Sequence, residues 1–140
     1  MKPLNLQLFW YEKDQSLIDT KELTKLSAAQ ESEFNEWEKQ RRKILSYELH
    51  QQTWVKVPND GASSELQFNS NGGVTEIELF GDKSLSGAWK VVDGVLFISM
   101  INNDATIEYQ VVANRAKNIH SGIQFINGAI CSYSKFIITK

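Results

Sequence analysis

Hydrophobic residues recur with a period of two over the second half of the chain. From residue 53 onward, short runs of alternating apolar and polar residues are separated by turn signals, which is typical of β-strands with one buried face. The clearest example spans residues 87–99 around Asp93-Gly94, a pair that favours a type I′ turn because glycine adopts a positive φ without strain. Apolar residues recur at every second position on both sides of this turn: Trp89, Val91, Val95 and Phe97. The stretch predicts a hairpin with these residues on one buried face.

Eight strands are predicted from this pattern, and no helical pattern interrupts them. They cover residues 53–57, 65–68, 74–80, 87–92, 95–101, 105–112, 119–126 and 129–139, with a second hairpin signal at Asn127-Gly128. Strands joined by short turns pair antiparallel, and a sheet of this many strands curls or closes so that its edges are covered. Residues 50–139 therefore predict an antiparallel up-and-down β-barrel, with a curled sheet or sandwich as the alternative, and a parallel α/β sheet is excluded.

The first 47 residues carry two other patterns. Apolar residues alternate with polar ones in residues 4–11, which predicts an N-terminal strand: Leu4, Leu6, Leu8 and Trp10. Residues 20–47 predict a helical segment, in which Ser27 and Gln30 form a capping box before a helix over residues 28–47. The apolar stripe of this helix consists of Phe34, Trp37, Ile44 and Leu45. We expect the helix to pack on the barrel, so that residues 1–140 form a single, mainly β domain of the α+β class.

Composition narrows the class of protein. The chain has 140 residues, 41% of them hydrophobic, which suffices for one domain with a buried core. A net charge of −2 disfavours a sequence-independent nucleic-acid binder. The N-terminal residues lack a signal-peptide core, and no apolar run reaches the roughly 18 residues that a membrane span requires. With a single cysteine, these features predict a soluble, cytoplasmic protein with neither a nucleic-acid nor a membrane partner.

Candidate catalytic chemistry is sparse. The two histidines, His50 and His120, have no metal-ligand spacing, and haem ligation by His120 is the alternative to a surface or hydrogen-bonded histidine. Cys131 has no basic residue nearby before Lys135, which favours a buried, inert thiol over a nucleophile. Gly-x-Ser-x-Gly, phosphate-loop and Gly-x-Gly-x-x-Gly patterns do not occur. The sequence therefore predicts no enzyme, no metal and no cofactor.

Several of these strand residues also follow the order found in a known family. The order is Trp54, then Phe68 before Asn71-Gly72, then Gly87-x-Trp89-x-Val91-x-Asp93-Gly94-x-Leu96, then Glu108-Tyr109 with Val111. Over roughly residues 50–139 this resembles small bacterial lipocalin-like domains. The resemblance implies a small barrel that holds an apolar ligand.

The first of two functional hypotheses is a non-catalytic protein that binds a protein partner through its surface, as an immunity protein or inhibitor does. In a strand over residues 4–11, Phe9 and Tyr11 share the face opposite Trp10. An outward aromatic pair suits a contact with the helix, a homodimer or a partner, although tertiary burial is favoured. The basic run at the end of the helix is favoured as a solvated face that matches the helix dipole, with a contact to a phosphate or an acidic partner as the alternative. The candidate contact residues are Phe9, Tyr11, Arg41, Arg42 and Lys43.

The second hypothesis is a lipocalin-like carrier or sensor of a small apolar ligand. An eight-stranded barrel has room for one small ligand or for its own side chains. The residues expected to line such a ligand site are Trp89, Val91, Phe97, Tyr109 and Phe125. Because the chain offers many large inward residues, a filled interior is favoured over a hollow one.

Overall fold

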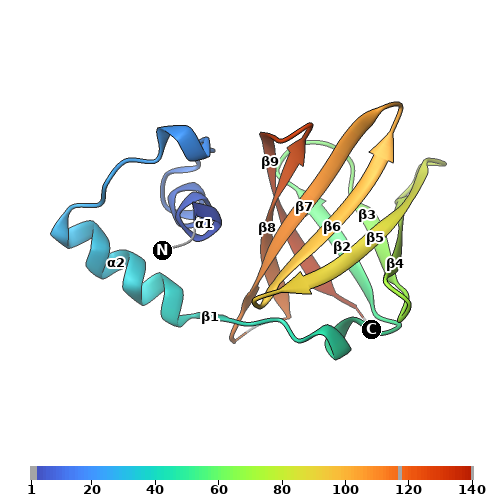
Figure 1. Cartoon of the computed structure of the whole chain (residues 1–140), viewed down its shortest axis with the longest axis horizontal. Coiled ribbons are helices and arrows are strands. Elements are labelled where there is room, and N and C mark those ends of the chain that lie inside the picture. Colours follow the sequence, from blue (N-terminus) through green and yellow to red (C-terminus); the bar gives the residue numbers. More distant parts are fainter. Residues whose placement is uncertain (1–2, 117, 140) are drawn as a thin grey trace.

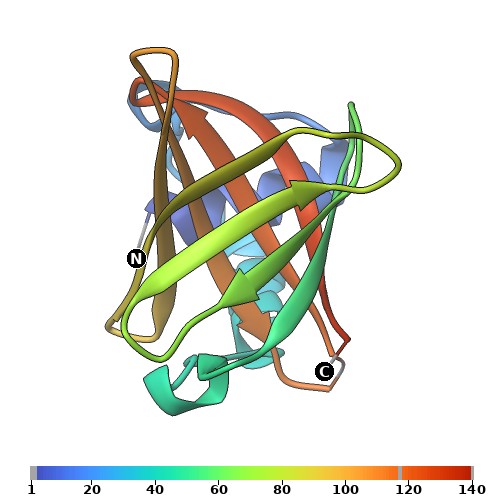
Figure 2. The ribbon, with the colours of Figure 1, turned by 90° about the vertical axis from the view of Figure 1, so that its right-hand side faces the viewer.

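Eight antiparallel strands close into a barrel in the computed structural model, which describes residues 3–116 and 118–139 (Figure 1). The strands follow one another around the barrel in chain order, and the last strand returns to pair with the first. Their bounds are β2 Thr53–Pro58, β3 Ser64–Phe68, β4 Gly73–Glu78, β5 Ser84–Val92, β6 Val95–Asn102, β7 Ala105–Asn114, β8 Ile119–Ile126 and β9 Ala129–Ile138. Figure 2 shows the wall from the side of β3, β4 and β5. The predicted up-and-down barrel is confirmed.

Three of the hairpins turn through two successive residues with positive φ. Paired positive φ values define turns whose twist matches that of antiparallel strands, which explains why Gly, Asn and Asp occupy them. The residues are Asp93 (51°) with Gly94 (82°), Asn103 (50°) with Asp104 (69°), and Asn127 (50°) with Gly128 (82°). The hairpins predicted at Asp93-Gly94 and Asn127-Gly128 are confirmed.

The hairpin of β5 and β6 does not bury all four of its alternating apolar residues on one face. Trp89 lies opposite Ile98, and Val91 lies opposite Leu96. Because the turn has two residues, odd positions of β5 share a face with even positions of β6. Trp89 and Val91 therefore face the interior, whereas Val95 and Phe97 pack outside the barrel, and the prediction of one shared face is wrong.

Cys131 is exposed, so the prediction of a buried thiol is also wrong. The register of β8 and β9 shifts at this point: Gln124 pairs with Ser132, and the next residue, Phe125, pairs with Ile130. Cys131 is the extra residue of this β-bulge, and alternation therefore does not apply to it.

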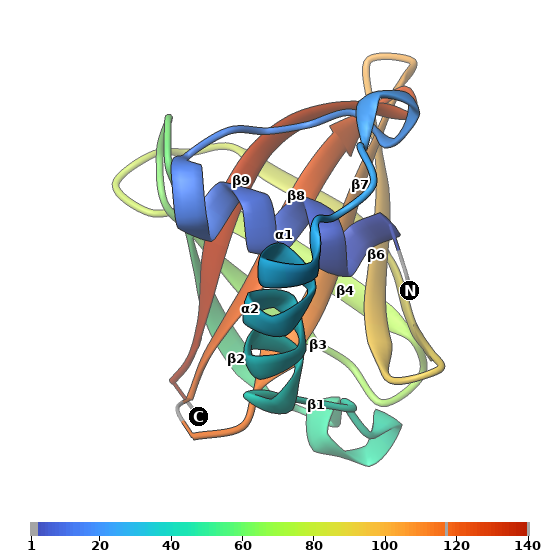
Figure 3. The ribbon, with the colours of Figure 1, turned by 90° about the vertical axis from the view of Figure 1, so that its left-hand side faces the viewer.

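Residues 4–11 lie in a helix, α1 (Pro3–Asp14), and the predicted N-terminal strand is wrong. Figure 3 shows α1 lying across β7, β8 and β9, with α2 (Ala28–Lys39) in front of it. Leu4, Leu8 and Tyr11 pack on the barrel, while Phe9 packs against Leu26 and Phe34 on the other side. A helix buried on two sides needs apolar residues around most of its circumference. In α1 these residues alternate with polar ones along the sequence, as they would in a strand with one buried face. No helix in the described ranges is long and apolar enough to cross a membrane.

The second helix begins where the sequence predicts and ends earlier. Ser27 accepts a hydrogen bond from the Gln30 amide, and the Gln30 side chain accepts one from the Ser27 amide, which confirms the capping box. The helix stops at Lys39 rather than at residue 47, because the chain then pairs with the end of β7 as the short strand β1 (Arg41–Arg42). One single-turn helix, η1 (Thr20–Glu22), precedes α2, and another, η2 (Ser46–Leu49), follows β1.

One end of the barrel is closed by the segment after β1. Ile44 and Leu49 join the apolar interior cluster, in which Trp54, Phe68 and Phe136 are almost fully buried. The segment lies at the bottom of the barrel in Figure 1, opposite the turns that join β6 to β7 and β8 to β9. Large side chains therefore fill the half of the barrel next to η2, as the sequence favours.

The packing of α1 on the barrel leads to a stability prediction. Leu8 is 0% exposed between α1 and the barrel wall, so Leu8→Ala should lower the free energy of unfolding by about 2 to 5 kcal/mol, measured by urea denaturation. Leu45, which is 48% exposed, is the matched control, and Leu45→Ala should have a much smaller effect. Equal losses in the two variants would show that α1 is not packed as described.

Candidate functional site

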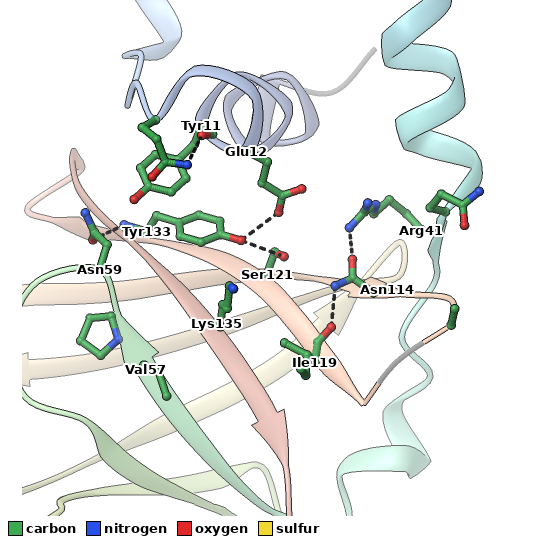
Figure 4. A pocket seen from close by; sticks show the side chains of 14 residues that line it. Tyr11, Glu12, Arg41, Val57, Asn59, Asn114, Ile119, Ser121, Tyr133 and Lys135 are labelled. Atoms are coloured by element: carbon green, nitrogen blue, oxygen red, sulfur yellow. Dashed lines mark hydrogen bonds between the residues drawn. The ribbon is translucent and has the colours of Figure 1, made fainter.

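A groove of about 620 Å³ lies between the helical segment and the outer wall of the barrel (Figure 4). The end of α1 forms one side, the start of β1 forms another, and the strands β2, β8 and β9 form the floor. The residues that shape it most directly are Tyr11, Glu12, Arg41, Asn114, Tyr133 and Lys135. They come from both termini and from the middle of the chain, and the packing of α1 brings them together.

Tyr133 is the central side chain of the groove floor. Its hydroxyl bonds to Glu12 Oε2 at 2.8 Å and to Ser121 Oγ at 3.2 Å, and its ring stacks on that of Tyr11 with centroids 4.2 Å apart. Glu12 also accepts a hydrogen bond from Trp37 Nε1 at 2.7 Å. Burial and the negative charge of Glu12 raise the pKa of Tyr133, so its hydroxyl stays protonated at neutral pH. Glu12 thus joins α1, α2 and β9 through one carboxylate.

Arg41 forms the opposite wall of the groove. Its Nε donates to the Trp37 carbonyl oxygen at 3.1 Å, its guanidinium carbon lies 4.2 Å from the centre of a Trp37 ring, and Nη1 donates to Asn114 Oδ1. Burial lowers the pKa of Arg41, while Glu12 opposes that shift, and a guanidinium remains charged in either case. These contacts hold the cation in one orientation and leave part of it in the groove.

Asn114 connects Arg41 to the barrel interior. Its side-chain amide donates to the Ile119 carbonyl oxygen, and its backbone amide donates to His120 Nδ1 at 3.1 Å. His120 is 1% exposed and packs against Trp54. Burial and the positive charge of Arg42 lower the pKa of His120 to about 4. The geometry is that of the hydrogen-bonded histidine expected from sequence.

The groove carries two positive groups. Lys135 is an exposed residue of β9, and Figure 4 shows it between the two ends of the groove, with Arg41 approaching from the α2 side. The one carboxylate in the groove lining, that of Glu12 among the described residues, already accepts hydrogen bonds from Trp37 and Tyr133. The lining therefore favours an anionic ligand group over a cationic one.

The structure brings together two of the five predicted contact residues, Tyr11 and Arg41. Phe9 (4% exposed) and Tyr11 (7% exposed) do not form an outward pair, because α1 is a helix that packs Phe9 against α2 and Tyr11 on the barrel. Both show the tertiary burial that the sequence favours. Arg42 forms an ion pair with Glu48 at 2.8 Å, and Lys43 forms an exposed pair with Asp93 at 3.2 Å. The basic run does not form one patch, because successive residues of an extended chain point in opposite directions.

The predicted apolar ligand site is also divided. Trp89, Val91 and Tyr109 face the interior cluster, whereas Phe97 and Phe125 lie in the outer cluster beneath α1. The two-residue turn between β5 and β6 accounts for the position of Phe97. These five residues therefore do not line one cavity.

Sequence reasoning missed most of the groove. Glu12, Asn114, Tyr133 and Lys135 line it, and Glu12 lies more than 100 residues before the other three, which it meets only because α1 crosses the barrel wall. One usable signal is the outward position of Tyr133 in the last predicted strand, where a large aromatic residue implies a covering element.

The groove has no grouping typical of a metal site. Among residues 3–116 and 118–139, no three His, Cys, Asp or Glu side chains are placed to hold a metal ion. The fold defines the class as a closed eight-stranded up-and-down barrel with an N-terminal helical arm. No family model, no curated protein and no solved structure matches the chain.

The lowered pKa of His120 predicts that the free energy of unfolding decreases in acid. Its pKa is about 4 in the fold against 6.5 for the unfolded chain, so the unfolded state binds the proton first as the pH falls. The free energy of unfolding should decrease by about 3 kcal/mol from this group between pH 6.5 and pH 4. His120→Asn, which keeps an acceptor near the Asn114 amide, should flatten this part of the curve in urea denaturation, and His50→Asn should not. A wild-type slope in His120→Asn would contradict the assignment.

The hydrogen bond from Tyr133 to Glu12 leads to a second stability prediction. Tyr133→Phe removes one donor from Glu12 and leaves that carboxylate partly desolvated, which should lower the free energy of unfolding by about 1 to 3 kcal/mol. Tyr47 is 69% exposed, and Tyr47→Phe should have almost no effect in the same thermal or urea measurement. If the two variants were indistinguishable, the Tyr133 hydroxyl would not connect α1 to the barrel.

Proposed function

We propose that this chain is a non-catalytic binding protein that recognises a protein partner through the groove between its helical arm and its barrel. The observation that carries the proposal is the fixed guanidinium of Arg41, stacked on Trp37 and bonded to Asn114 at the edge of a groove of about 620 Å³. Arg and aromatic residues are enriched where protein partners contribute most of their binding energy. An immunity- or inhibitor-like role suits such a surface.

The charge of the groove suggests what the partner presents. Arg41 and Lys135 outnumber the single carboxylate of Glu12, which leaves the groove lining with a net positive charge among the described residues. We infer that an Asp or Glu side chain of the partner docks between the two cations. A planar guanidinium held in one orientation loses little conformational entropy when it binds a carboxylate in a bidentate manner.

The proposal also includes the class of barrel to which the protein belongs and its location in the cell. The closed barrel over residues 53–138 supports the lipocalin-like resemblance stated from sequence. An exposed free thiol at Cys131 suits a reducing compartment, which supports a cytoplasmic protein. The barrel half next to η2 is filled by Trp54, Phe68 and Phe136, which favours the partner-binding hypothesis over a carrier of an apolar ligand.

A site-specific cross-linking experiment tests the proposed groove. Asn59 is exposed at its rim, and Lys90 is exposed on β5, outside the groove. Each is replaced by the photoreactive residue p-benzoylphenylalanine, and the protein is irradiated in the cells of origin. We expect a heterologous protein to be cross-linked from position 59 and not from position 90.

Charge reversal provides the matched variant for that experiment. Lys135→Glu should reduce the cross-linked product at position 59 about tenfold, because it places a like charge beside the partner's carboxylate, whereas Lys90→Glu should not change it. Both variants should unfold at nearly the wild-type urea concentration. A product of twice the chain mass would instead show a homodimer, and equal labelling from both positions would overturn the groove as the docking site.

A further inference from the structure

A second cavity, of about 490 Å³, lies at the end of the barrel opposite η2. It is lined by residues from the β2–β3 loop, the strands β3, β4 and β5, the β4–β5 loop and the end of β6. Two of its lining side chains, Ser64 (3% exposed) and Glu76 (8% exposed), are also parts of the barrel interior. We call this cavity the mouth; it is separate from the groove, with which it shares no lining residue.

The floor of the mouth belongs to a buried charged network. Lys56 Nζ lies 2.7 Å from Glu76 Oε2 and donates to the Tyr109 hydroxyl at 2.7 Å, and Tyr109 donates to Glu76 Oε1 at 2.5 Å. Ser64 Oγ donates to the same carboxylate. Burial alone would raise the pKa of Glu76, but Lys56 and the three hydrogen bonds hold it below its usual value, so the carboxylate is charged at neutral pH.

Barrel closure does not require this network. The half of the interior next to η2 is packed with apolar residues, and a buried ion pair contributes no more to stability than well-packed apolar residues of similar volume. Removal of one partner is strongly destabilising, whereas replacement of both is neutral or favourable. The placement of Lys56 and Glu76 below an open cavity therefore calls for an explanation beyond stability.

Ser134 supplies an independent observation. It is 1% exposed on β9, and its Oγ has no hydrogen-bond partner among the described residues. It pairs in register with Pro58, one inward-facing position beyond Lys56 on the side of the mouth. A buried hydroxyl without a partner costs about 1 to 3 kcal/mol, and a ligand group that reaches it recovers that loss.

We propose that the mouth binds a small polar molecule that presents hydrogen-bond donors, either hydroxyl or ammonium groups. The carboxyl oxygens of Glu76 and Glu78 and the lone pairs of Ser64 are acceptors, since Ser64 uses its proton on Glu76. Lys56 and Lys83 balance the two carboxylates, so the site selects donors by geometry and not by net charge. The inward Ser134 hydroxyl lies toward the mouth from Lys56 but outside the lining of the cavity, and it adds a contact to a ligand that extends toward β9. The proposal is independent of the groove.

Titration of two probes, followed by amide chemical shifts, tests this proposal on the full chain. The probes are myo-inositol, which offers hydroxyl donors, and 1,4-diaminobutane, which offers ammonium donors. We expect at least one of them to give saturable shifts at millimolar concentration in β3, β4 and β9, with the groove amides unmoved. The probe that saturates identifies the donor type, and saturation by neither probe overturns the proposal.

Two variants separate binding from folding. Ser134→Ala should weaken binding about fivefold without loss of stability, whereas Ser99→Ala, on the exposed face of β6, should leave affinity unchanged. The double variant Lys56→Met/Glu76→Leu should remain folded, because no buried charge is left unpaired, although the Ser64 and Tyr109 hydroxyls lose their partner and stability decreases. It should lose the saturable shifts. Wild-type affinity in both the Ser134→Ala protein and the double variant would overturn the proposal.

Discussion

The burial of α1 on two sides is the constraint on which the architecture outside the barrel depends. One side of α1 needs the outer wall of β6 to β9, and the other needs α2, so the two helices and the wall can pack only as three layers. This arrangement places Glu12 over Tyr133 and within reach of Trp37. It also directs the chain from α2 into β1, which joins the end of β7. The groove is a by-product of this packing, because the end of α1 overhangs a wall that α2 does not cover.

The barrel has an unequal interior for a related reason. The segment after β1 closes one end with Ile44 and Leu49, and this end can be apolar and dry because water is excluded. The opposite end has no such cover, and its inward positions carry Lys56, Glu76 and Ser134. The apolar residues at the closed end supply the stabilisation from hydrophobic burial. The fold therefore tolerates the buried ion pair at the other end, which itself contributes little to the free energy of unfolding.

Most of the barrel could be predicted from the sequence because strands and hairpin turns are local features. The alternation in residues 105–112 and the pairs Asp93-Gly94 and Asn127-Gly128 were sufficient. The faces of the strands were harder to assign, since a two-residue turn changes the parity of the inward positions, as Phe97 shows. Helix α1 was missed because tertiary burial on two sides removed its polar face. Of the groove, only Tyr11 and Arg41 were found, because the remaining contacts join residues up to 121 positions apart.

Closure of the sheet limits the ways in which another chain can bind to this barrel. Within the described ranges, each strand of the barrel has hydrogen-bonded neighbours on both sides, so the main-chain donors and acceptors along its paired length are already used. An incoming extended peptide finds no open barrel edge to which it could add as a ninth barrel strand, and neither does a second copy of the barrel. Main-chain pairing depends little on which side chains are present, whereas contacts such as those of Arg41 depend on the identity of the side chain. The barrel thus protects the chain from edge-to-edge aggregation, and the binding of a partner to it, as proposed, would depend on side-chain chemistry, which single substitutions can change.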